Sequence, residues 1–529
     1  MPTDCISYQT SGYFSKLIQD YLDQISELKP LYNHFPTLEN FEKQIIEKQS
    51  NFDDANRIPL VESLKKQYQN IEISDFTRQN IELLALPNTF TITTGHQLNL
   101  FSGPLYFLYK IISTINLTKE LKSKYPTYNF VPIYWMATED HDFEEINYFN
   151  FKGKKFRWHK ESTGPVGRLS TEGLAEFFEI YSKELGSSTN ANVIKKLFED
   201  AYLQHDKLAD ATRFLADSLF TAHGLVILDA DDPNLKRSFI PFIKEELEQQ
   251  ISFKAVQQTI EKLKDYTIQV NPREINLFYI EDNLRERIIF ENDKYFVNNT
   301  KMSFSKQEIF ELLESNPEKF SPNVIMRPLY QEIILPNLCY IGGGGEIAYW
   351  LELKAFFDAV NITFPMLLVR NSVLLATEKQ GKKADSLGLS WKDLFTKPAE
   401  LANTITHKLS AFPIDLTTQK ETLKKQFEYL YELAQQTDKS FSGAVKAQET
   451  KQKKGLENLE KRLLKAQKRK LNDELQRVSD LQSELFPNSS LQERQSNFSE
   501  FYMETGEQLI PLLIQKLKPL ETNFNIITI

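Results

Sequence analysis

Three polar side chains and a glycine stand between a predicted strand and a predicted helix. The β-branched stretch 90–94 is typical of a buried strand and ends at Gly95, and His96, Gln97 and Asn99 follow before an apolar helix pattern. Turns of this kind bind ligands in α/β proteins, and a helix N-terminus favours an anion. We predict that His96 and Gln97 contact an activated carboxylate or a phosphate and that Gly95 and Asn99 bind substrate. The alternative is that His96 only caps the helix.

A second group of residues crowds three carboxylates around one histidine, directly after the predicted strand 131–137. These residues are Glu139, Asp140, His141 and Asp142. Neighbouring carboxylates raise one another's pKa and that of a histidine, so such a cluster can deprotonate an ammonium nucleophile, orient sugar hydroxyls or hold a metal. The spacing matches no metal-ligand signature, which disfavours a permanent metal. We assign Asp140, His141 and Asp142 to catalysis and Glu139 to substrate binding, without deciding which carboxylate is the base; the alternative is helix capping by Asp140.

A run of four glycines, 342–345, precedes another predicted helix. Glycines allow close backbone approach, so their N–H groups could hold phosphate or carboxylate oxygens, although the run matches neither the P-loop nor the dinucleotide-binding pattern. The alternative is a flexible turn. Arg327 is a candidate anion clamp. The predicted substrate-binding residues of this region are Arg327, Tyr340, Gly343, Gly344, Gly345, Glu346 and Trp350.

Acidic residues also end a third predicted strand. Asp229 and Asp231 could contact a ribose or another sugar, or cap a helix, and neither interpretation is favoured. Together with Arg370 and Asn371, which end a fourth strand, they are the predicted cofactor-binding residues. The segment 301–305, Lys-Met-Ser-Phe-Ser, is similar to the KMSKS loop of class I aminoacyl-tRNA synthetases. It precedes the fourth strand, whereas that loop follows the last one, so we interpret the similarity as coincidence.

The elements that must position these residues alternate between short apolar strands and helices, which indicates a parallel, doubly wound sheet of the α/β class. We expect this core within residues 1–382. Residues 146–159 favour a hairpin and 275–296 a meander, in lobes inserted at about 146–222 and 251–320. The four predicted strands are 90–94, 131–137, 224–229 and 364–370.

The segment 383–486 follows a different pattern. Apolar residues at heptad-like spacing predict a helical hairpin built as an antiparallel coiled coil, with Asp438 able to cap its second helix. A continuous second arm over 439–485 would be about 70 Å long, although the step from Ala466 to Leu471 interrupts the seam. Residues 487–529 return to globular patterning and are predicted to pack back on the core.

The surface of this hairpin is locally basic. Residues 446–484 contain 11 Lys and Arg against 7 Asp and Glu. We interpret the charges as a solvated coiled-coil face rather than a nucleic-acid surface. A dimer contact is the leading functional interpretation, because one hairpin leaves apolar seam to cover.

Composition excludes several classes of protein. The 529 residues carry a formal charge of −9, which argues against general nucleic-acid binding. Only two cysteines occur, Cys5 and Cys339, too far apart in sequence for a disulfide framework and typical of a reducing cytosol. No apolar run approaches the roughly 20 residues of a membrane span, and no signal peptide is evident. We therefore expect a cytoplasmic protein without a membrane segment.

Taken together, these motifs resemble the BshC family, the cysteine-adding enzymes of bacillithiol biosynthesis. The resemblance spans nearly the whole chain, and the motifs occur in the same order. The matching stretches are Thr94–Gln97, Gly103–Tyr106, Trp135–Phe143, Asp229–Pro233, Asn271–Phe278, Arg327–Gln331 and Gly345–Trp350, with Gly455–Glu457 and Lys461–Ala466 in the coiled coil.

The resemblance implies a Rossmann-like core with connecting inserts and a coiled-coil domain used in dimerisation. It implies a ligase that joins the carboxyl group of L-cysteine to the amine of glucosaminyl-malate, and a bound nucleotide, ATP or ADP, whose role is open. Asp140, His141 and Asp142 would then deprotonate the amine. The rival hypotheses are a class I synthetase-like nucleotidyltransferase acting on another small carboxylate, which lacks its own signatures here, and a non-catalytic scaffold.

Overall fold

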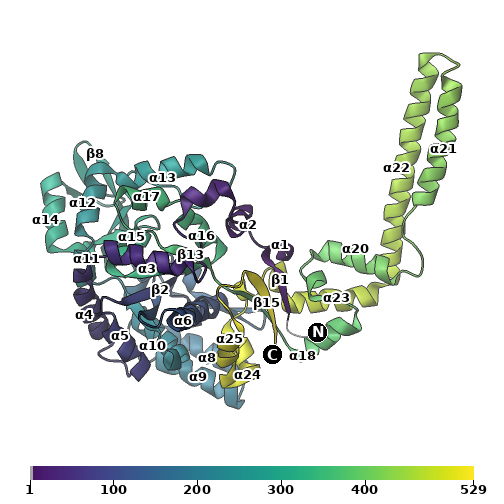
Figure 1. Cartoon of the computed structure of the whole chain (residues 1–529). Coiled ribbons are helices and arrows are strands. Elements are labelled where there is room, and N and C mark those ends of the chain that lie inside the picture. Colours follow the sequence, from purple (N-terminus) through teal and green to yellow (C-terminus); the bar gives the residue numbers. More distant parts are fainter. Residues whose placement is uncertain (1–3) are drawn as a thin grey trace. The chain divides into compact units, whose positions relative to one another are not determined.

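A five-stranded parallel sheet organises the larger part of the chain in this computed structural model, which describes residues 4–529 (Figure 1). Its strands lie in the spatial order β13-β12-β2-β3-β6. They are β2 (Thr89–His96), β3 (Asn129–Met136), β6 (Val226–Asp229), β12 (Asn337–Gly342) and β13 (Met366–Val369). The prediction of a parallel α/β sheet is confirmed, with the four predicted strands in place.

The sequence prediction missed β12, the strand between β13 and β2. It begins with a polar residue, Asn337, whose side-chain carbonyl accepts hydrogen bonds from the hydroxyls of Thr91 (3.3 Å) and Thr93 (2.9 Å), and it ends in the glycine run, so its apolar stretch is short. From β2 the chain moves outward to β3 and β6, then returns to the other side of β2 as β12 and β13. The junction of β2 and β12 is therefore the switch point at which ligands bind in open α/β sheets.

Apolar helix faces cover this sheet. Helix α6 (Tyr106–Lys124) follows β2 and packs on β2 and β3, while α3 (Asn40–Asn51) packs on β12. The shared core includes Phe41, Phe90 and Ile341. The described residues up to 85 are mainly helical. Besides α3 they include α2 (Lys16–Leu22), α4 (Arg57–Gln67), α5 (Asp75–Leu83) and a short strand, β1 (Asp4–Ser7).

The first inserted segment contains the predicted hairpin. Strands β4 (Tyr148–Phe151) and β5 (Lys154–Arg157) pair antiparallel around Lys152 and Gly153, both at positive φ, as a tight hairpin turn requires. Three helices follow, and aromatic side chains of the first pack on the hairpin; the Phe149 and Tyr181 rings, for example, lie 4.9 Å apart. These helices are α8 (Leu174–Leu185), α9 (Thr189–Tyr202) and α10 (Leu208–Phe220).

The second inserted segment is an antiparallel sheet of order β10-β9-β8-β7-β11. The predicted meander is confirmed and extended by two short strands. Residues 301–305 include the edge strand β10, which belongs to this sheet and not to the parallel one. The strands are β7 (Leu277–Glu281), β8 (Leu284–Glu291), β9 (Lys294–Val297), β10 (Ser303–Phe304) and β11 (Phe320–Pro322), flanked by α13 (Ile251–Lys262) and α14 (Lys306–Ser315).

The chain divides into two compact units, one containing residues 5–374 and 490–527 and the other mainly 375–489. The second unit holds the predicted helical hairpin, α21 (Thr417–Ala434) and α22 (Lys439–Lys470), whose arms bury Leu423, Phe427 and Val445 between them. Asp438 caps α22, accepting hydrogen bonds from the backbone N–H groups of Ser440 and Phe441.

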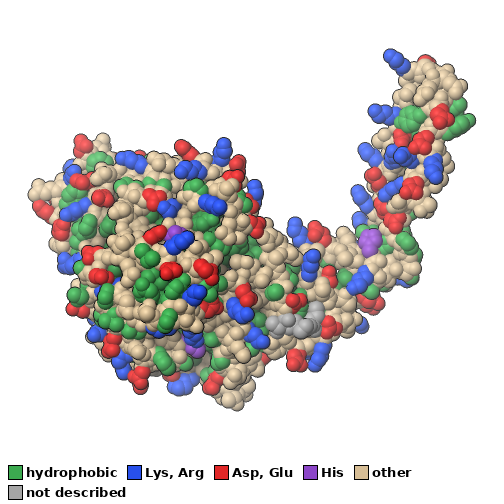
Figure 2. Space-filling view, viewed as in Figure 1, with side chains coloured by type: hydrophobic (Ala, Val, Ile, Leu, Met, Phe, Trp, Pro, Cys, Tyr) green, Lys and Arg blue, Asp and Glu red, His purple; other side chains and the backbone are tan. Residues whose placement is uncertain are grey.

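The prediction that the second arm of the hairpin is one continuous helix over 439–485 was wrong. Helix α22 ends at Lys470, Leu471 leaves helical geometry (φ −98°, ψ 23°), and α23 (Asn472–Leu485) begins a separate helix. The break lies where the heptad seam is interrupted, since a shifted seam no longer faces one partner. Lys and Arg side chains alternate with Asp and Glu along the hairpin (Figure 2).

Residues 490–527 belong to the same unit as the parallel sheet. Helix α25 (Leu509–Lys516) packs on α6, where the Asn116 side chain donates to the carbonyls of Ile514 (2.9 Å) and Leu517 (2.7 Å). A three-stranded sheet, β1-β15-β14, includes β14 (Ser372–Ala376) and β15 (Asn523–Thr528). Between residues 4 and 529, no helix has the length and apolar character needed to cross a bilayer.

Candidate active site

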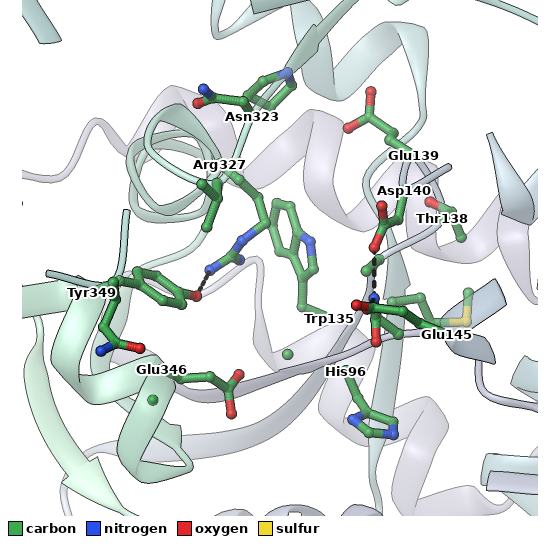
Figure 3. A pocket seen from close by; sticks show the side chains of 18 of the residues that line it. His96, Trp135, Thr138, Glu139, Asp140, Glu145, Asn323, Arg327, Glu346 and Tyr349 are labelled. Carbon is green, nitrogen blue, oxygen red and sulfur yellow. Dashed lines mark hydrogen bonds between the residues drawn. The ribbon is translucent and has the colours of Figure 1, made fainter. Parts of the chain in front are cut away.

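A cavity of about 990 Å³ opens at the carboxyl ends of β2 and β12. Figure 3 shows residues from separate parts of the chain converging on it, among them His96, Asp140, Arg327 and Glu346. Its location follows from the strand order, because the helices after β2 and β12 diverge at a switch point. Seven cationic side chains line it, against four carboxylates. The cations are Lys110, Arg273, Arg285, Arg287, Arg327, Arg370 and Arg494, and the carboxylates are Glu139, Asp140, Glu145 and Glu346.

His96 ends β2 with its side chain 7% exposed and its ring against Tyr106 and Phe107. Burial, followed by the positive charges of Lys110 and Arg370, holds the pKa of the imidazole well below 6.5. A hydrogen bond to the Ser102 backbone raises that pKa, as expected when the ring donates, and Nε2 has no partner among the described residues. His96 is therefore a neutral imidazole whose Nε2 lone pair is available.

Lys110, on α6, was not predicted as a site residue. Its ammonium donates to the Gly95 carbonyl (2.7 Å) and pairs with Glu346 (2.6 Å). Glu346 also accepts from the Tyr340 hydroxyl and the Gly343 N–H, both at 2.8 Å. Burial alone would raise the pKa of the Glu346 carboxyl. Lys110 and these donors have a larger, opposite effect, so the pKa is lowered and the carboxylate stays ionised. This network ties β2, β12 and α16 (Gly344–Leu351) together at the switch point.

Two arginines flank that network. Arg327, on α15 (Met326–Ile334), donates to the Tyr349 hydroxyl (3.3 Å), and its guanidinium lies 5.6 Å from the Trp135 ring centroid. Arg370 pairs with Glu493 through both terminal nitrogens (3.0 and 2.7 Å), while its Nε has no acceptor among residues 4–529. Both guanidinium groups thus reach the cavity with positive charge suited to carboxylate or phosphate oxygens.

The predicted acidic loop after β3 is only partly in the cavity. The Gln97 amide bridges Asp140 (2.9 Å) and Glu145 (2.8 Å), and all three side chains line the wall. His141 is half-exposed and meets Arg285 at 2.8 Å; burial and then this arginine lower the pKa of the His141 imidazole. His141 does not line the cavity itself. Asp142 precedes the short helix α7 (Phe143–Ile146) without capping it through its side chain.

A closed ion network lies beside the cavity, around β6. The buried Lys236 ammonium pairs with Glu139 and, at 3.3 Å, with Asp231, which also receives a two-pronged contact from Arg168 (2.7 and 2.9 Å). Burial raises the pKa of the Asp231 carboxyl, but Lys236 and Arg168 together lower it more. Asp229 accepts from the Thr138 hydroxyl. Of these acids only Glu139 lines the cavity, so the network is satisfied by the protein itself.

The structure thus brings most of the predicted site residues to one cavity. Several others lie behind its wall: Trp350 is fully buried against Tyr340, Asn371 bonds to Ser113 inside the core, and Asn99 donates to the Glu145 carbonyl. Gly344 lines only a neighbouring, smaller cavity. The predicted residues at the large cavity are Gly95, His96, Gln97, Glu139, Asp140, Arg327, Tyr340, Gly343, Gly345, Glu346 and Arg370.

Five charged residues of the cavity had no sequence signal as site residues. Lys110 lies in an apolar helix pattern, Arg285 and Arg287 in the meander, Glu145 after the acidic loop, and Arg494 in the C-terminal segment. A charged residue inside an otherwise apolar helix, as at Lys110, is the one signal that could have been followed, because burial of an unpaired charge is costly. In the described chain no group of three or more His, Cys, Asp or Glu is arranged to hold a metal ion.

Known protein families and relatives match this chain over nearly its whole length. The protein-family model described as "Bacillithiol biosynthesis BshC, N-terminal Rossmann-like domain" matches residues 1–371. A second family model, "Bacillithiol biosynthesis BshC, C-terminal coiled-coil domain", matches residues 373–529. A Flavobacterium johnsoniae protein is 85% identical over 100% of both chains. A Flavobacterium psychrophilum protein is 65% identical over 100% of this chain and 99% of its own. A Cytophaga hutchinsonii protein is 39% identical over 98% and 97%, respectively. All three are named "Putative cysteine ligase BshC".

Proposed function

The chain belongs to the BshC family of bacillithiol biosynthesis, and we propose that it joins the carboxyl group of L-cysteine to the amine of glucosaminyl-malate. The relatives' name supplies the ligase activity and the cysteine. The observation that carries the proposal is the switch-point cavity, where a buried imidazole with a free nitrogen lies among cationic side chains. Its volume of about 990 Å³ accommodates two small substrates together.

We assign His96 as the general base. An amine attacks an acyl group only when it is unprotonated, and the nitrogen must lose a further proton as the amide forms. His96 Nε2 has no partner in the described chain and can accept that proton; burial, Lys110 and Arg370 lower the pKa of the imidazole, which keeps it unprotonated at neutral pH but also makes it a weak base. Gln97 orients Asp140 and Glu145, and we assign this pair to holding the substrate ammonium or sugar hydroxyls before attack.

We assign the cationic side chains to the anionic groups of the substrates. Malate carries carboxylates, and cysteine presents one to be activated. Arg327 and Arg370 flank the glycine run on one wall, and Arg285 with Arg287 lies on the wall formed by the antiparallel sheet. Planar guanidinium groups bind carboxylates through two hydrogen bonds, so this arrangement suits a substrate with more than one carboxylate.

Activation of the cysteine carboxylate requires a group that the amine can displace, and we propose ATP as its source. Arg370 is the predicted nucleotide-binding residue that reaches the cavity, whereas Asp229, Asp231 and Asn371 are bonded within the protein. We also propose a cytoplasmic reaction. A homodimer formed through α21 and α22 is a further proposal, supported by Tyr429 (61% exposed) and Leu459 (54% exposed) on the hairpin.

The test begins with purified protein, L-cysteine, glucosaminyl-malate and ATP, followed by mass spectrometry of small thiols. We expect bacillithiol to form, no product without cysteine, and a rate at least about a hundredfold lower with the His96→Gln variant. In a strain lacking the gene, bacillithiol should disappear and glucosaminyl-malate accumulate, with both effects reversed on restoration of the gene. Unchanged bacillithiol in that strain would contradict the proposal and favour a nucleotidyltransferase acting on another carboxylate.

A further inference from the structure

A second cavity, of about 150 Å³, lies on the other side of the glycine run. It shares Gly343, Gly345, Gln269, Arg370 and Arg494 with the large cavity. The remaining wall comes from the N-terminal segment, α16, the end of β13, the start of β14 and the segment after residue 490. Those residues are Tyr13, Phe14, Ser15, Gly344, Ala348, Val369, Ser372, Leu491 and Glu493.

The N-terminus of α16 opens into this cavity. The Gly343 N–H is bonded to the Glu346 side chain, and the helical ladder begins with the Ile347 N–H on the Gly343 carbonyl (3.0 Å). Gly344 and Gly345 are the first two residues of α16, so their N–H groups have no acceptor within the helix. They are donors at a helix start, where the backbone carries partial positive charge.

Arg370 supplies an independent, buried donor at the same place. Its side chain is 3% exposed, and its terminal nitrogens are bonded to Glu493 and to the Asn371 carbonyl. Its Nε, which has no acceptor in the described chain, lies 3.8 Å from the position that a Cβ on Gly343 would occupy. A buried donor without an acceptor costs free energy, so an acceptor arriving between Arg370 and the glycines would be stabilised.

The charge balance in the small cavity favours an anion. Glu493 is its only carboxylate, and both of its oxygens are occupied by Arg370 and by the Val373 N–H (3.0 Å). Arg494 adds an exposed guanidinium whose side chain lines both cavities. The Ser15 hydroxyl also lines the cavity, whereas the Ser372 hydroxyl donates to Glu493 (3.4 Å).

We infer that the small cavity is a binding site for one oxyanion, a phosphate or a carboxylate group. Its volume suits such a group and is far below that of a pocket for a nucleoside. The site rests on the geometry alone, and only the source of the oxyanion rests on the proposed function. The shared wall allows the anion to belong to a nucleotide or to the acidic substrate held in the large cavity.

The experiment is calorimetric titration of the full-length protein with inorganic phosphate. Gly344 lines only the small cavity, and a Cβ there would meet Ile18 at 3.4 Å and Phe14 at 3.8 Å, which is ordinary contact. Gly344→Asp places a carboxylate at the first position of α16, which suits the helix but competes with the anion. Gly344→Ala adds the same Cβ without charge and is its matched control.

A second pair of variants keeps the test independent of the glycine. Arg494→Gln removes a cation from both cavities, whereas Arg273→Gln removes an exposed cation that lines only the large one. We expect Gly344→Asp and Arg494→Gln to weaken phosphate binding about tenfold or more. Gly344→Ala and Arg273→Gln should stay within about threefold of the unmodified protein.

Equal phosphate affinity in Gly344→Asp and Gly344→Ala, or weakening by Arg273→Gln alone, would overturn the inference. Competition identifies the source: displacement of phosphate by ADP points to a nucleotide phosphate, and displacement by malate points to the substrate carboxylate. These titrations need no turnover. Phosphate binding without bacillithiol formation would reject the proposed function and keep the site, and the reverse result would reject only the site.

Discussion

Two clusters of charged residues lie side by side at the carboxyl edge of the parallel sheet, and they differ in what satisfies them. Around β2 and β12, His96 Nε2 and Arg370 Nε are buried without a partner in the described chain. Around β6, Lys236, Asp231 and Arg168 form a closed network in which each charge meets an opposite one. Residue type at a strand end did not separate them, since both were predicted to bind ligands.

The difference teaches that, among the charged residues at these strand ends, pairing within the protein separates the closed network from the cavity better than acidity does. A buried polar group without a partner costs free energy, and at the cavity a ligand can remove that cost for His96 and Arg370. The closed network has no unpaired charge. Its ion pairs hold Glu139, in the loop after β3, against the segment around Arg168 through Lys236 and Asp231. The same segment packs closely, because a Cβ on Gly167 would lie 2.5 Å from Thr138.

The largest expected effect is on the open cluster. His96→Gln removes the proposed base while keeping a polar side chain of similar reach, and we expect kcat/KM for amide formation to fall about 10²- to 10⁴-fold. The free energy of unfolding should fall by about 1–3 kcal/mol in urea titrations, because the variant loses the ring contacts with Tyr106 and Phe107 and the hydrogen bond to the Ser102 backbone. A variant that keeps more than a tenth of the activity would remove His96 from the chemistry.

The closed cluster should respond in the opposite way, through stability. Lys236→Met leaves Glu139 and Asp231 buried without their cation, and we expect the free energy of unfolding to fall by about 3–5 kcal/mol. The matched control is Lys244→Met, which breaks the exposed pair with Glu314 and should cost less than about 1 kcal/mol. Similar unfolding curves for the two variants would show that the network is not closed.

Two arginines sharpen the comparison further. Arg327→Lys replaces the planar guanidinium in the open cavity with an ammonium group, which cannot bind a carboxylate through two parallel hydrogen bonds. KM for glucosaminyl-malate should therefore rise about tenfold, with the free energy of unfolding nearly unchanged. Arg168→Lys loses the two-pronged contact with Asp231, so it should lower the free energy of unfolding by about 1–2 kcal/mol and leave KM unchanged. Steady-state kinetics and urea titrations of both variants measure this split, and a KM effect for Arg168→Lys alone would reverse the two roles.

The smallest expected effect concerns the pH at which activity is lost on the acidic side. His96 must be neutral to accept a proton, and its pKa is held well below 6.5 by burial and by Lys110 and Arg370. The loss of activity that is due to protonation of His96 should therefore occur below pH 6.5 in the kcat/KM profile, separate from any loss caused by protonation of the substrate amine, and His96→Gln should lack it. An acidic limb at or above 6.5 would point to a different titrating group.

Local patterns predicted much of the fold and part of the site. The turn at Gly95–Gln97 and the acids after β3 were recognisable because a strand pattern stops at each of them, and the carboxyl ends of parallel strands meet at one edge. β12 was missed because its apolar residues begin after a polar one, Asn337, and run directly into the glycines, so the segment was interpreted as part of the glycine loop. Arg285 and Arg494 could not be assigned, because nothing in an exposed strand or a C-terminal segment tells which surface it will face.

The sequence alone determined the class of the fold and the family of the chain, since hydrophobic periodicity and ordered motifs are properties of the chain itself. Only the tertiary structure decided which charged residues became the cavity and which became the closed network. That decision depends on partners distant in sequence: Lys110 reaches Glu346, Arg370 reaches Glu493, and Lys236 reaches Glu139. Whether a buried charge is satisfied is a property of its neighbours in space, and local patterns do not contain it.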